Sequence, residues 1–390
     1  MEKGGTECTC EARVRAFLRL LKWTEGTENE GDDAYRTLFS FKKFDDYSKY
    51  PMDIVKASGY SSSAAGAYQI NIACYKTLQG YYKNKLNQWK QDTNNDYITK
   101  YKINGFTPLE QDKLTLLILI HKRKGLIHDI INKEFSKGLR IHASYEWASM
   151  PPKRYDQPAK SFEEVANRYK KYFEEELEGN TNLYLEEGFL KEFGIKCNCK
   201  SSSSADECTC GKKHIDLTDK MIFYDQGSGN QKCNLTCKAI MRQMGVEAEG
   251  ATEVNRHSFY QLALEDSIHS KLVFAPEKIK TGMAYLDSSL DKNEPVLVGL
   301  DHTLDGGINN EGDIQTTDHY VIIIGRKCIN GKVYYPYWDV GTMHGSKDAY
   351  RFELQSDGTL INENGYGGRN KPDGRKYTVT QIRRNSKVKL

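Results

Sequence analysis

Apolar residues in the first half of the chain recur with the period of an α-helix. They follow the i, i+3, i+4, i+7 spacing of an amphipathic helix at Val14, Phe17, Leu18 and Leu21. The apolar run 114–120 and the stretch 162–172 also favour helices. This pattern predicts a mainly helical first half.

The second half combines one predicted helix with the short apolar runs of buried strands. The helix begins at Cys233, and the continuous apolar runs 295–300 and 320–325 follow it. The dipeptide Asn330-Gly331 is typical of a type I′ hairpin turn that leads into a further strand. We therefore expect a helix followed by a sheet.

A helical half followed by a half with a helix and strands indicates two separate domains. At 390 residues the chain also exceeds one ordinary core, because domains usually hold about 100–200 residues. We predict a mainly α domain at 11–195 and an α+β domain at 213–390. A Cys- and Ser-rich linker is expected between them, at 196–212.

Composition and charge exclude several classes of protein. The net charge of +3 does not indicate the strongly basic surface of a nucleic-acid-binding protein. An aromatic content of 11% excludes a chain that is disordered throughout. The run 114–120 is too short to span a bilayer, and residues 1–15 lack the apolar core of a signal peptide. We expect neither membrane insertion nor a cleaved leader.

The cysteines form three Cys-x-Cys pairs near the predicted domain ends, at Cys8/Cys10, Cys197/Cys199 and Cys208/Cys210. The second and third pairs flank a Ser-rich stretch and could together ligate zinc. The usual zinc-ribbon spacing is Cys-x2-Cys, so disulfides or thiols within a linker are the preferred interpretation. We assign no metal and no cofactor.

Glu25 has the position expected of a general acid. It lies four residues after Leu21, so it continues the apolar face of the first helix, and Gly26 can end that helix in a left-handed conformation. A carboxyl on an apolar face close to Trp23 is partly desolvated, and desolvation raises its pKa. Cleavage of a glycosidic bond needs such an acid. A glutamate at a helix end is also commonly just solvated, so the residue alone does not decide.

Five motifs follow one another along the chain, at 23–27, 44–51, 63–69, 106–112 and 147–157, and the first of them contains Glu25. In this order they resemble the phage lambda-type endolysins and related muramidases, over most of residues 12–175. The resemblance implies a lysozyme-like fold that cuts the glycan strand of peptidoglycan, with Glu25 as catalytic acid. It also implies that Tyr68 and Gln69 line the glycan cleft. A core aromatic and a structural amide are equally compatible with these two residues.

The outcome of the glycan cleavage depends on a second carboxylate. A hydrolase generally uses one to activate water or to trap the sugar, whereas a lytic transglycosylase lets a hydroxyl of the muramic acid attack. Asp45 and Asp46 could supply the carboxylate, although a solvated loop is favoured. The resemblance to lambda-type enzymes favours transglycosylation.

Cys233 stands where a Gly- and Asn-rich loop enters a predicted helix. A helix N-terminus favours the thiolate, which is the nucleophilic form of cysteine. His319 and Asp339, in neighbouring predicted strands, are candidates for the proton carrier and its orienting partner. Residues 221–345 thereby resemble papain-like cysteine peptidases, in particular the bacteriocin-leader-peptidase-like branch. The resemblance implies that Gln226 or Gln231 donates to the oxyanion.

Two alternatives remain open at this thiol site. Cys237 follows Gln231 by six residues, the spacing of the papain archetype, and competes with Cys233, which we favour because it lies at the helix start. A two-residue turn at Asn330-Gly331 would pair Asp339 with Ile322 instead of His319. A longer loop or a bulge, which Gly325 could host, would correct this register.

These features predict a bifunctional peptidoglycan-degrading enzyme, in which Glu25 cleaves glycan and Cys233 cleaves an amide of the stem peptide or cross-bridge. A bacterial cytoplasm would make it, and it would act in the periplasm or cell wall, as a phage endolysin or, slightly favoured, an antibacterial effector with an immunity protein as partner. The alternatives are a wall-binding protein whose peptidase half is degenerate, and a peptidase that acts on proteins.

Overall fold

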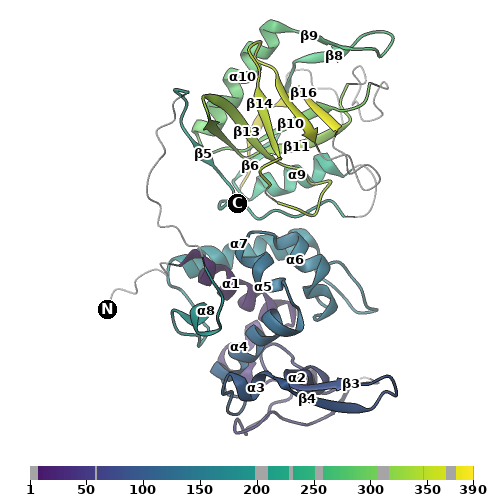
Figure 1. Cartoon of the computed structure of the whole chain (residues 1–390), viewed down its shortest axis with the longest axis vertical. Helices are drawn as coiled ribbons and strands as arrows, with labels where there is room; N and C mark the ends of the chain where they lie inside the picture. Colours follow the sequence, from purple (N-terminus) through teal and green to yellow (C-terminus); the bar gives the residue numbers. More distant parts are fainter. Residues whose placement is uncertain are drawn as a thin grey trace. The chain divides into compact units, whose positions relative to one another are not determined.

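The chain divides into two compact units, one formed by residues 1–132 and 137–201 and the other by 133–136 and 202–390 (Figure 1). The computed structural model describes residues 8–57, 59–197, 210–227, 232–250, 258–304, 316–345, 347–365 and 375–389. The boundary at residue 201 lies inside the segment that the sequence identifies as a linker.

Helices dominate the first unit. They are α1 (Thr9–Thr24), α2 (Ile72–Leu78), α3 (Tyr97–Lys100), α4 (Pro108–Leu117), α5 (Leu126–Ile131), α6 (Phe135–Ile141), α7 (Phe162–Leu177) and α8 (Phe189–Glu192). A π-helical turn, Ile118–Lys122, continues α4, and 3-10 segments span Glu28–Arg36, Phe39–Phe41 and Ala143–Tyr145. The three helices predicted from periodicity are confirmed, because α1, α4 with its π turn, and α7 contain them.

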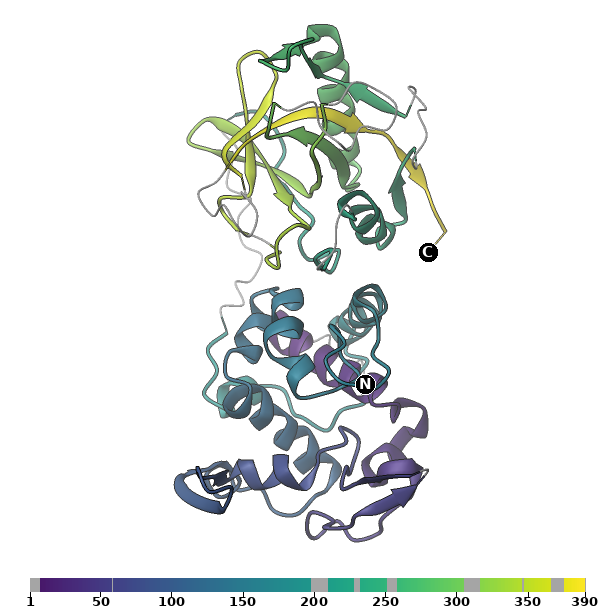
Figure 2. The same cartoon turned by 90° about the vertical axis from the view of Figure 1, so that its right-hand side faces the viewer.

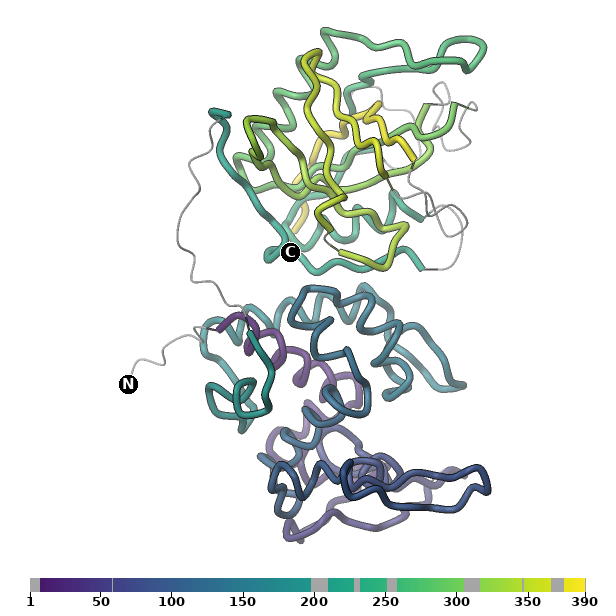
Figure 3. The backbone as a smooth tube through the Cα atoms, in the orientation of Figure 1, coloured from purple at the N-terminus to yellow at the C-terminus, as the bar shows by residue number. Residues whose placement is uncertain are grey.

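Two small hairpins complete this unit. β1 (Val55–Ala57) pairs with β2 (Tyr60–Ser62), and β3 (Gln79–Lys83) pairs with β4 (Trp89–Asp96), all antiparallel. Figure 3 shows the β3–β4 hairpin projecting away from the helices, which agrees with the exposure of most of β4.

Helix α1 is buried on nearly all of its faces, which corrects the expectation of one apolar stripe. It packs beside α5 and α7 (Figure 1). Its charged side chains are buried with partners: Glu11 accepts from the backbone N–H groups of Gly188 and Leu190, and Arg15 donates to the carbonyl of Leu185. Later segments of the unit thus cover the face that would otherwise be solvated, and they supply hydrogen-bond partners to Glu11 and Arg15.

Arg19 makes the strongest of these buried contacts. Its guanidinium binds Glu175 and lies 3.0 Å from the carboxylate of Glu176, which has no exposed surface. It also lies over the ring of Tyr172, 4.4 Å from the centroid. These contacts join α1 to α7.

The described part of the second unit contains two helices and a large antiparallel sheet. The helices are α9 (Cys233–Arg242) and α10 (Pro276–Asp291). The strands are β5 (Ile215–Asp216), β6 (Val246–Ala248), β7 (Phe259–Gln261), β8 (Ala263–Glu265), β9 (Leu272–Phe274), β10 (Val296–Asp301), β11 (His319–Ile323), β12 (Gly325–Ile329), β13 (Lys332–Trp338), β14 (Arg351–Leu354), β15 (Leu360–Gly365), β16 (Arg375–Arg383) and β17 (Asn385–Lys387).

The sheet closes on itself as a barrel. Its strand order is β11-β10-β16-β15-β14-β13, and β13 pairs again with β11. Figure 2 shows the long strand β16, drawn in yellow, crossing this sheet, and it lies between β10 and β15. Helix α9 precedes most of the strands, as predicted, but β5 comes before it and helix α10 was not predicted. The papain-like arrangement of this unit stays a prediction.

The Asn330-Gly331 signal correctly predicted the hairpin formed by β12 and β13. Asn330 and Gly331 have φ angles of 50° and 77°, the two positive values that a type I′ turn requires. Ile329 pairs with Lys332 across the turn, so β12 and β13 form the predicted hairpin.

Cysteines within each unit pair over long distances in sequence. Cys10 is bonded to Cys197 in the first unit, and Cys210 to Cys328 in the second. The zinc site considered for 197/199 with 208/210, for which disulfides or thiols are the preferred interpretation, is not described, because Cys199 and Cys208 lie outside the described residues. Within the described ranges, no helix combines the length and the apolar character needed to cross a membrane.

Replacing Arg19 by Met should destabilise the first unit by about 3–5 kcal/mol, because Glu176 would remain buried without its cation. Lys171→Met is the matched control, since Lys171 faces Glu175 from the exposed side and should cost less than about 1 kcal/mol. Urea unfolding measures both losses. Equal effects of the two substitutions would contradict a structural role for the buried pair.

Candidate active sites

Glu25 is positioned by the C-terminus of α1. The helix ends at Thr24, and the backbone N–H of Glu25 still donates to the carbonyl of Leu21 at 2.9 Å. Gly26 then takes a left-handed φ of 77°, as predicted for a helix stop. Thr27 fixes the turn by donating its hydroxyl to the carbonyl of Ala67 at 2.6 Å. The side chain of Glu25 therefore projects from a helix end that these hydrogen bonds hold in place.

The carboxyl of Glu25 is half-buried and makes one side-chain hydrogen bond, in which Ser149 donates to Oε1 at 2.5 Å. Burial raises the pKa of Glu25 to about 7, although the hydrogen bond from Ser149 acts in the opposite direction. Near neutral pH the protonated and ionised forms are therefore both populated. This is the state that a general acid needs.

A cavity of about 680 Å³ opens beside Glu25. The residues that line it are Glu25, Thr27, Thr37, Leu38, Phe39, Ser40, Phe41, Tyr60, Ser61, Ser62, Ala64, Gln69, Ala148, Ser149, Asp156, Gln157 and Pro158. It thus combines exposed aromatic rings, such as Phe41 and Tyr60, with several hydroxyl groups. Flat apolar faces beside hydroxyls suit a saccharide. Sequence reasoning missed the 39–41 and 60–62 segments, which carry no local signal of a site.

Tyr68 and Gln69 have different roles in this region. Tyr68 has no exposed surface and donates its hydroxyl to the buried carboxylate of Asp112 at 2.6 Å. The expectation that Tyr68 faces a saccharide is therefore corrected, because its side chain belongs to the core. Gln69 does line the cavity, and its Nε2 donates to the carbonyls of Thr37 and Gly66.

The second carboxylate near this cavity comes from neither Asp45 nor Asp46. Both are exposed, and Asp45 pairs with Arg36, so the favoured solvated loop agrees with their positions. Among the described residues that line the cavity, Asp156 supplies the other carboxylate, and its side chain is fully exposed.

Cys233 begins helix α9 and is buried, with 7% of its surface exposed. Burial alone would raise the pKa of Cys233, but the hydrogen bond with His319 and the charge of that imidazole outweigh it and lower the pKa. Hydrogen bonds from the backbone N–H groups of Tyr320 and Asn234 act in the same direction. The thiolate is thus favoured at this position.

Asp339 completes a chain of contacts through His319. Nε2 of the imidazole lies 2.7 Å from Oδ1 of Asp339, so Nδ1 is the ring nitrogen available to Cys233. Burial opposes protonation of the imidazole, but the Asp339 carboxylate raises the pKa of His319 well above its usual value. Asp339 is fully buried and also accepts from the N–H of Gly341 at 2.8 Å and from the hydroxyl of Tyr377 at 3.2 Å.

Strand β13 pairs first with β12 and then with β11, and its register shifts by one residue between the two. This shift brings His319 and Asp339 together. Beside the turn, Cys328 pairs with Val333, and continuing this register would place Ile322 opposite Asp339. Instead Ile322 pairs with Trp338, because the ladder is interrupted between β11 and Gly325, which pairs with β5. Continued towards His319, the new register places Gly341 opposite it and Asp339 two residues earlier on the same face. The bulge anticipated near Gly325 is therefore present.

Cys237, the competing thiol, and Asp318, the acidic neighbour of His319 in the chain, do not take the places of Cys233 and Asp339. Cys237 has no exposed surface, and burial raises its pKa well above the usual value, so the structure brings Cys233 and not Cys237 to the imidazole. Asp318 accepts from the N–H groups of His302 and Thr303, both at 2.9 Å. Its carboxylate thus serves the neighbouring backbone.

The proposed oxyanion donors are only partly described. Gln226 is half-buried, and its N–H donates to the carbonyl of Val340 at 2.9 Å, which places it beside Asp339. Gln231 lies outside the described residues. Sequence reasoning missed Tyr377, whose hydroxyl supports Asp339 from β16, because nothing local to residue 377 indicates that contact.

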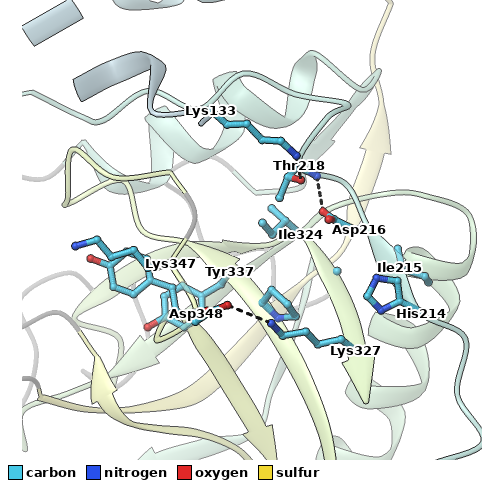
Figure 4. A pocket seen from close by; sticks show the side chains of 13 residues that line it. Lys133, His214, Ile215, Asp216, Thr218, Ile324, Lys327, Tyr337, Lys347 and Asp348 are labelled. Atoms are coloured by element: carbon cyan, nitrogen blue, oxygen red, sulfur yellow. Dashed lines mark hydrogen bonds and ion pairs between the residues drawn. The ribbon is translucent and has the colours of Figure 1, made fainter. Parts of the chain in front are cut away.

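A separate cavity of about 430 Å³ lies elsewhere in the second unit (Figure 4). Its lining includes His214, Lys327 and Asp348, and the last two form an ion pair of 3.8 Å. None of Cys233, His319 and Asp339 lines it. This cavity is therefore separate from the hydrogen-bonded group of Cys233, His319 and Asp339.

Comparisons with known proteins concern the first unit. Residues 15–174 match the model of the family described as Endolysin. The curated endolysin of Escherichia phage lambda is 26% identical over 148 residues, which cover 37% of this chain and 80% of that protein.

Two solved structures are also similar. They are a bacteriophage lambda lysozyme in complex with a chitohexasaccharide (23% identity, 41% of this chain and 94% of that chain, TM-score 0.33) and a further lysozyme from bacteriophage lambda (24%, 42% and 94%, TM-score 0.32). The N-terminal region of this chain thus matches the phage lambda endolysin.

Proposed function

We propose that the first unit cleaves the glycan strand of peptidoglycan, with Glu25 as the acid that protonates the glycosidic oxygen. The observation that carries this proposal is a half-buried carboxyl of raised pKa, about 7, on the wall of a 680 Å³ cavity. The endolysin match over residues 15–174 supports the same substrate.

The second carboxylate decides between hydrolysis and transglycosylation. Asp156, the other carboxylate on the described cavity wall, is fully exposed. A solvated side chain does not hold an attacking water, or trap a sugar, as a fixed one does. This favours attack by the muramic acid's own hydroxyl, which leaves an anhydro end. Glu25, having donated its proton to the leaving oxygen, would then accept the proton of that hydroxyl.

For the second unit we propose amide cleavage by Cys233. The thiolate attacks the carbonyl carbon, and His319 transfers a proton to the leaving amine while Asp339 holds the imidazole in place. The N-terminal N–H groups of α9 and the side chain of Gln226 would stabilise the oxyanion. Water then hydrolyses the thioester and regenerates the thiol.

The proposed substrate of this thiol is an amide of the stem peptide or cross-bridge, because both units would then act on one polymer. A released endolysin and an antibacterial effector with an immunity protein both agree with this chemistry. A leader peptidase that cuts proteins, and a degenerate peptidase half, remain the alternatives. The assembled Cys233–His319–Asp339 chain favours an active thiol over a degenerate one.

Alkylation of Cys233 by iodoacetamide should proceed at a pH below that of an ordinary thiol, because His319 favours the thiolate. In His319→Ala the pH profile should move upward, and the rate near pH 6 should fall about tenfold or more. Mass spectrometry of the Cys233 peptide measures the rate. Cys237→Ala is the control and should leave the profile unchanged, whereas identical profiles for wild type and His319→Ala would contradict the pairing.

Removal of the Ser149 hydroxyl should move the alkaline limit of glycan cleavage upward by about half a pH unit or more. The hydrogen bond from Ser149 favours the ionised carboxylate, so Ser149→Ala should keep Glu25 protonated to a higher pH. Release of glycan fragments from sacculi, measured against pH, tests this. Ser61→Ala, on the same cavity wall, should not move the limit. A downward shift in Ser149→Ala would refute the assignment of Glu25 as acid.

Single substitutions should separate the two activities. Glu25→Gln should lower the rate of glycan cleavage by about a hundredfold or more and retain peptide cleavage. Cys233→Ala should lower the rate of peptide cleavage and retain glycan cleavage. Mass spectrometry of products from purified sacculi reads both, and anhydro ends would distinguish transglycosylation from hydrolysis. Peptide cleavage that survives Cys233→Ala but not Cys237→Ala would overturn the choice of nucleophile.

A further inference from the structure

Three cysteine sulfurs converge at the N-terminus of α1. The Sγ atoms of Cys8, Cys10 and Cys197 all lie within 4.8 Å of one another, and the Cys8 and Cys197 sulfurs are 3.3 Å apart. Two of these residues flank Thr9, and the third lies 187 positions beyond Cys10. The bond between Cys10 and Cys197 does not account for the close approach of the Cys8 sulfur to that of Cys197.

Once the Cys10–Cys197 bond is reduced, three sulfurs that converge within 4.8 Å could hold a metal as thiolates. With a zinc–sulfur distance of about 2.3 Å, sulfurs of a tetrahedral site lie about 3.8 Å apart. Among the described residues, this is the one group of His, Cys, Asp and Glu side chains whose ligand atoms converge in this way. Cys10 is buried and the other two are half-buried, so the group is largely sheltered from solvent.

Two of the three cysteines lie at the start of α1. Cys8 is the N-cap and Cys10 the second residue of a 16-residue helix, where the helix dipole stabilises negative charge. The carboxylate of Glu11, in the same turn, is engaged by the N–H groups of Gly188 and Leu190. Three thiolates this close repel one another, and a bound cation would offset that repulsion.

We propose that Cys8, Cys10 and Cys197, when reduced, bind one thiophilic divalent cation such as zinc. Reduction of the Cys10–Cys197 bond by a thiol or phosphine supplies two electrons and two protons, and metal binding then releases the thiol protons. A solvent molecule or a further thiolate would occupy the fourth position of the metal.

The site would join the start of α1 to the segment that follows α8. Helix α1 carries Glu25 at its other end, so the metal would anchor the helix that positions the proposed acid. The inference does not depend on the proposed reaction, because it rests on the sulfur positions alone.

Cobalt binding tests the site. The full-length chain, reduced with a phosphine and freed of metal, is titrated with Co²⁺ and then with Zn²⁺. We expect thiolate-to-cobalt charge-transfer absorption at about one equivalent, displacement by zinc, and a rise in the thermal midpoint of the reduced chain on zinc binding.

Cys8→Ser is the decisive variant, because it leaves the Cys10–Cys197 pair intact. A metal site that includes Cys8 predicts at least about tenfold weaker cobalt binding in this variant than in the reduced wild type, whereas binding by the other reduced thiols without Cys8 predicts no change. Cys328→Ser and Cys233→Ala are matched controls outside the cluster and should retain the absorption. Absence of cobalt binding by the reduced wild type, equal binding by Cys8→Ser, or loss of binding in both controls would overturn the proposal.

Discussion

Burial of helix α1 is the constraint on which the first unit depends. The helix carries charged residues on faces that the fold encloses, so each charge requires a partner from a distant segment. Arg19 forms an ion pair with Glu176, Arg15 donates to a carbonyl, and Glu11 accepts from two backbone N–H groups. These contacts hold the helix in one position, and its last turn therefore delivers Glu25 to the cavity wall at a fixed place.

The two candidate sites use burial in opposite ways. At Glu25 removal from water dominates, and the pKa of an ordinary carboxyl rises to about 7. At Cys233 burial would also favour the neutral form, but the imidazole of His319 outweighs it and favours the thiolate. An acid must keep a proton and a nucleophile must lose one. Exclusion of water in each unit can serve either task, because the partners of the two groups differ.

Asp339 holds the thiol site of the second unit in place, as the contacts of α1 hold Glu25 in the first unit. It is fully buried, and it accepts from the N–H of Gly341 and the hydroxyl of Tyr377 while its other interaction goes to His319. A buried carboxylate without these donors would be costly. The donors come from β16 and from the turn after β13, two parts of the closed barrel. The contacts of Asp339 therefore depend on closure of the sheet.

Sequence alone determined the features that arise within a few residues. Apolar periodicity located α1 and α7, the Asn330-Gly331 turn located a hairpin, and a helix start located Cys233. Only the tertiary structure decided the one-residue shift beside Gly325, the enclosure of Tyr68, the support from Tyr377, and the meeting of Cys10 with Cys197. Each of these depends on segments that lie far apart in the chain, and local patterns of side chains do not encode which of them come into contact.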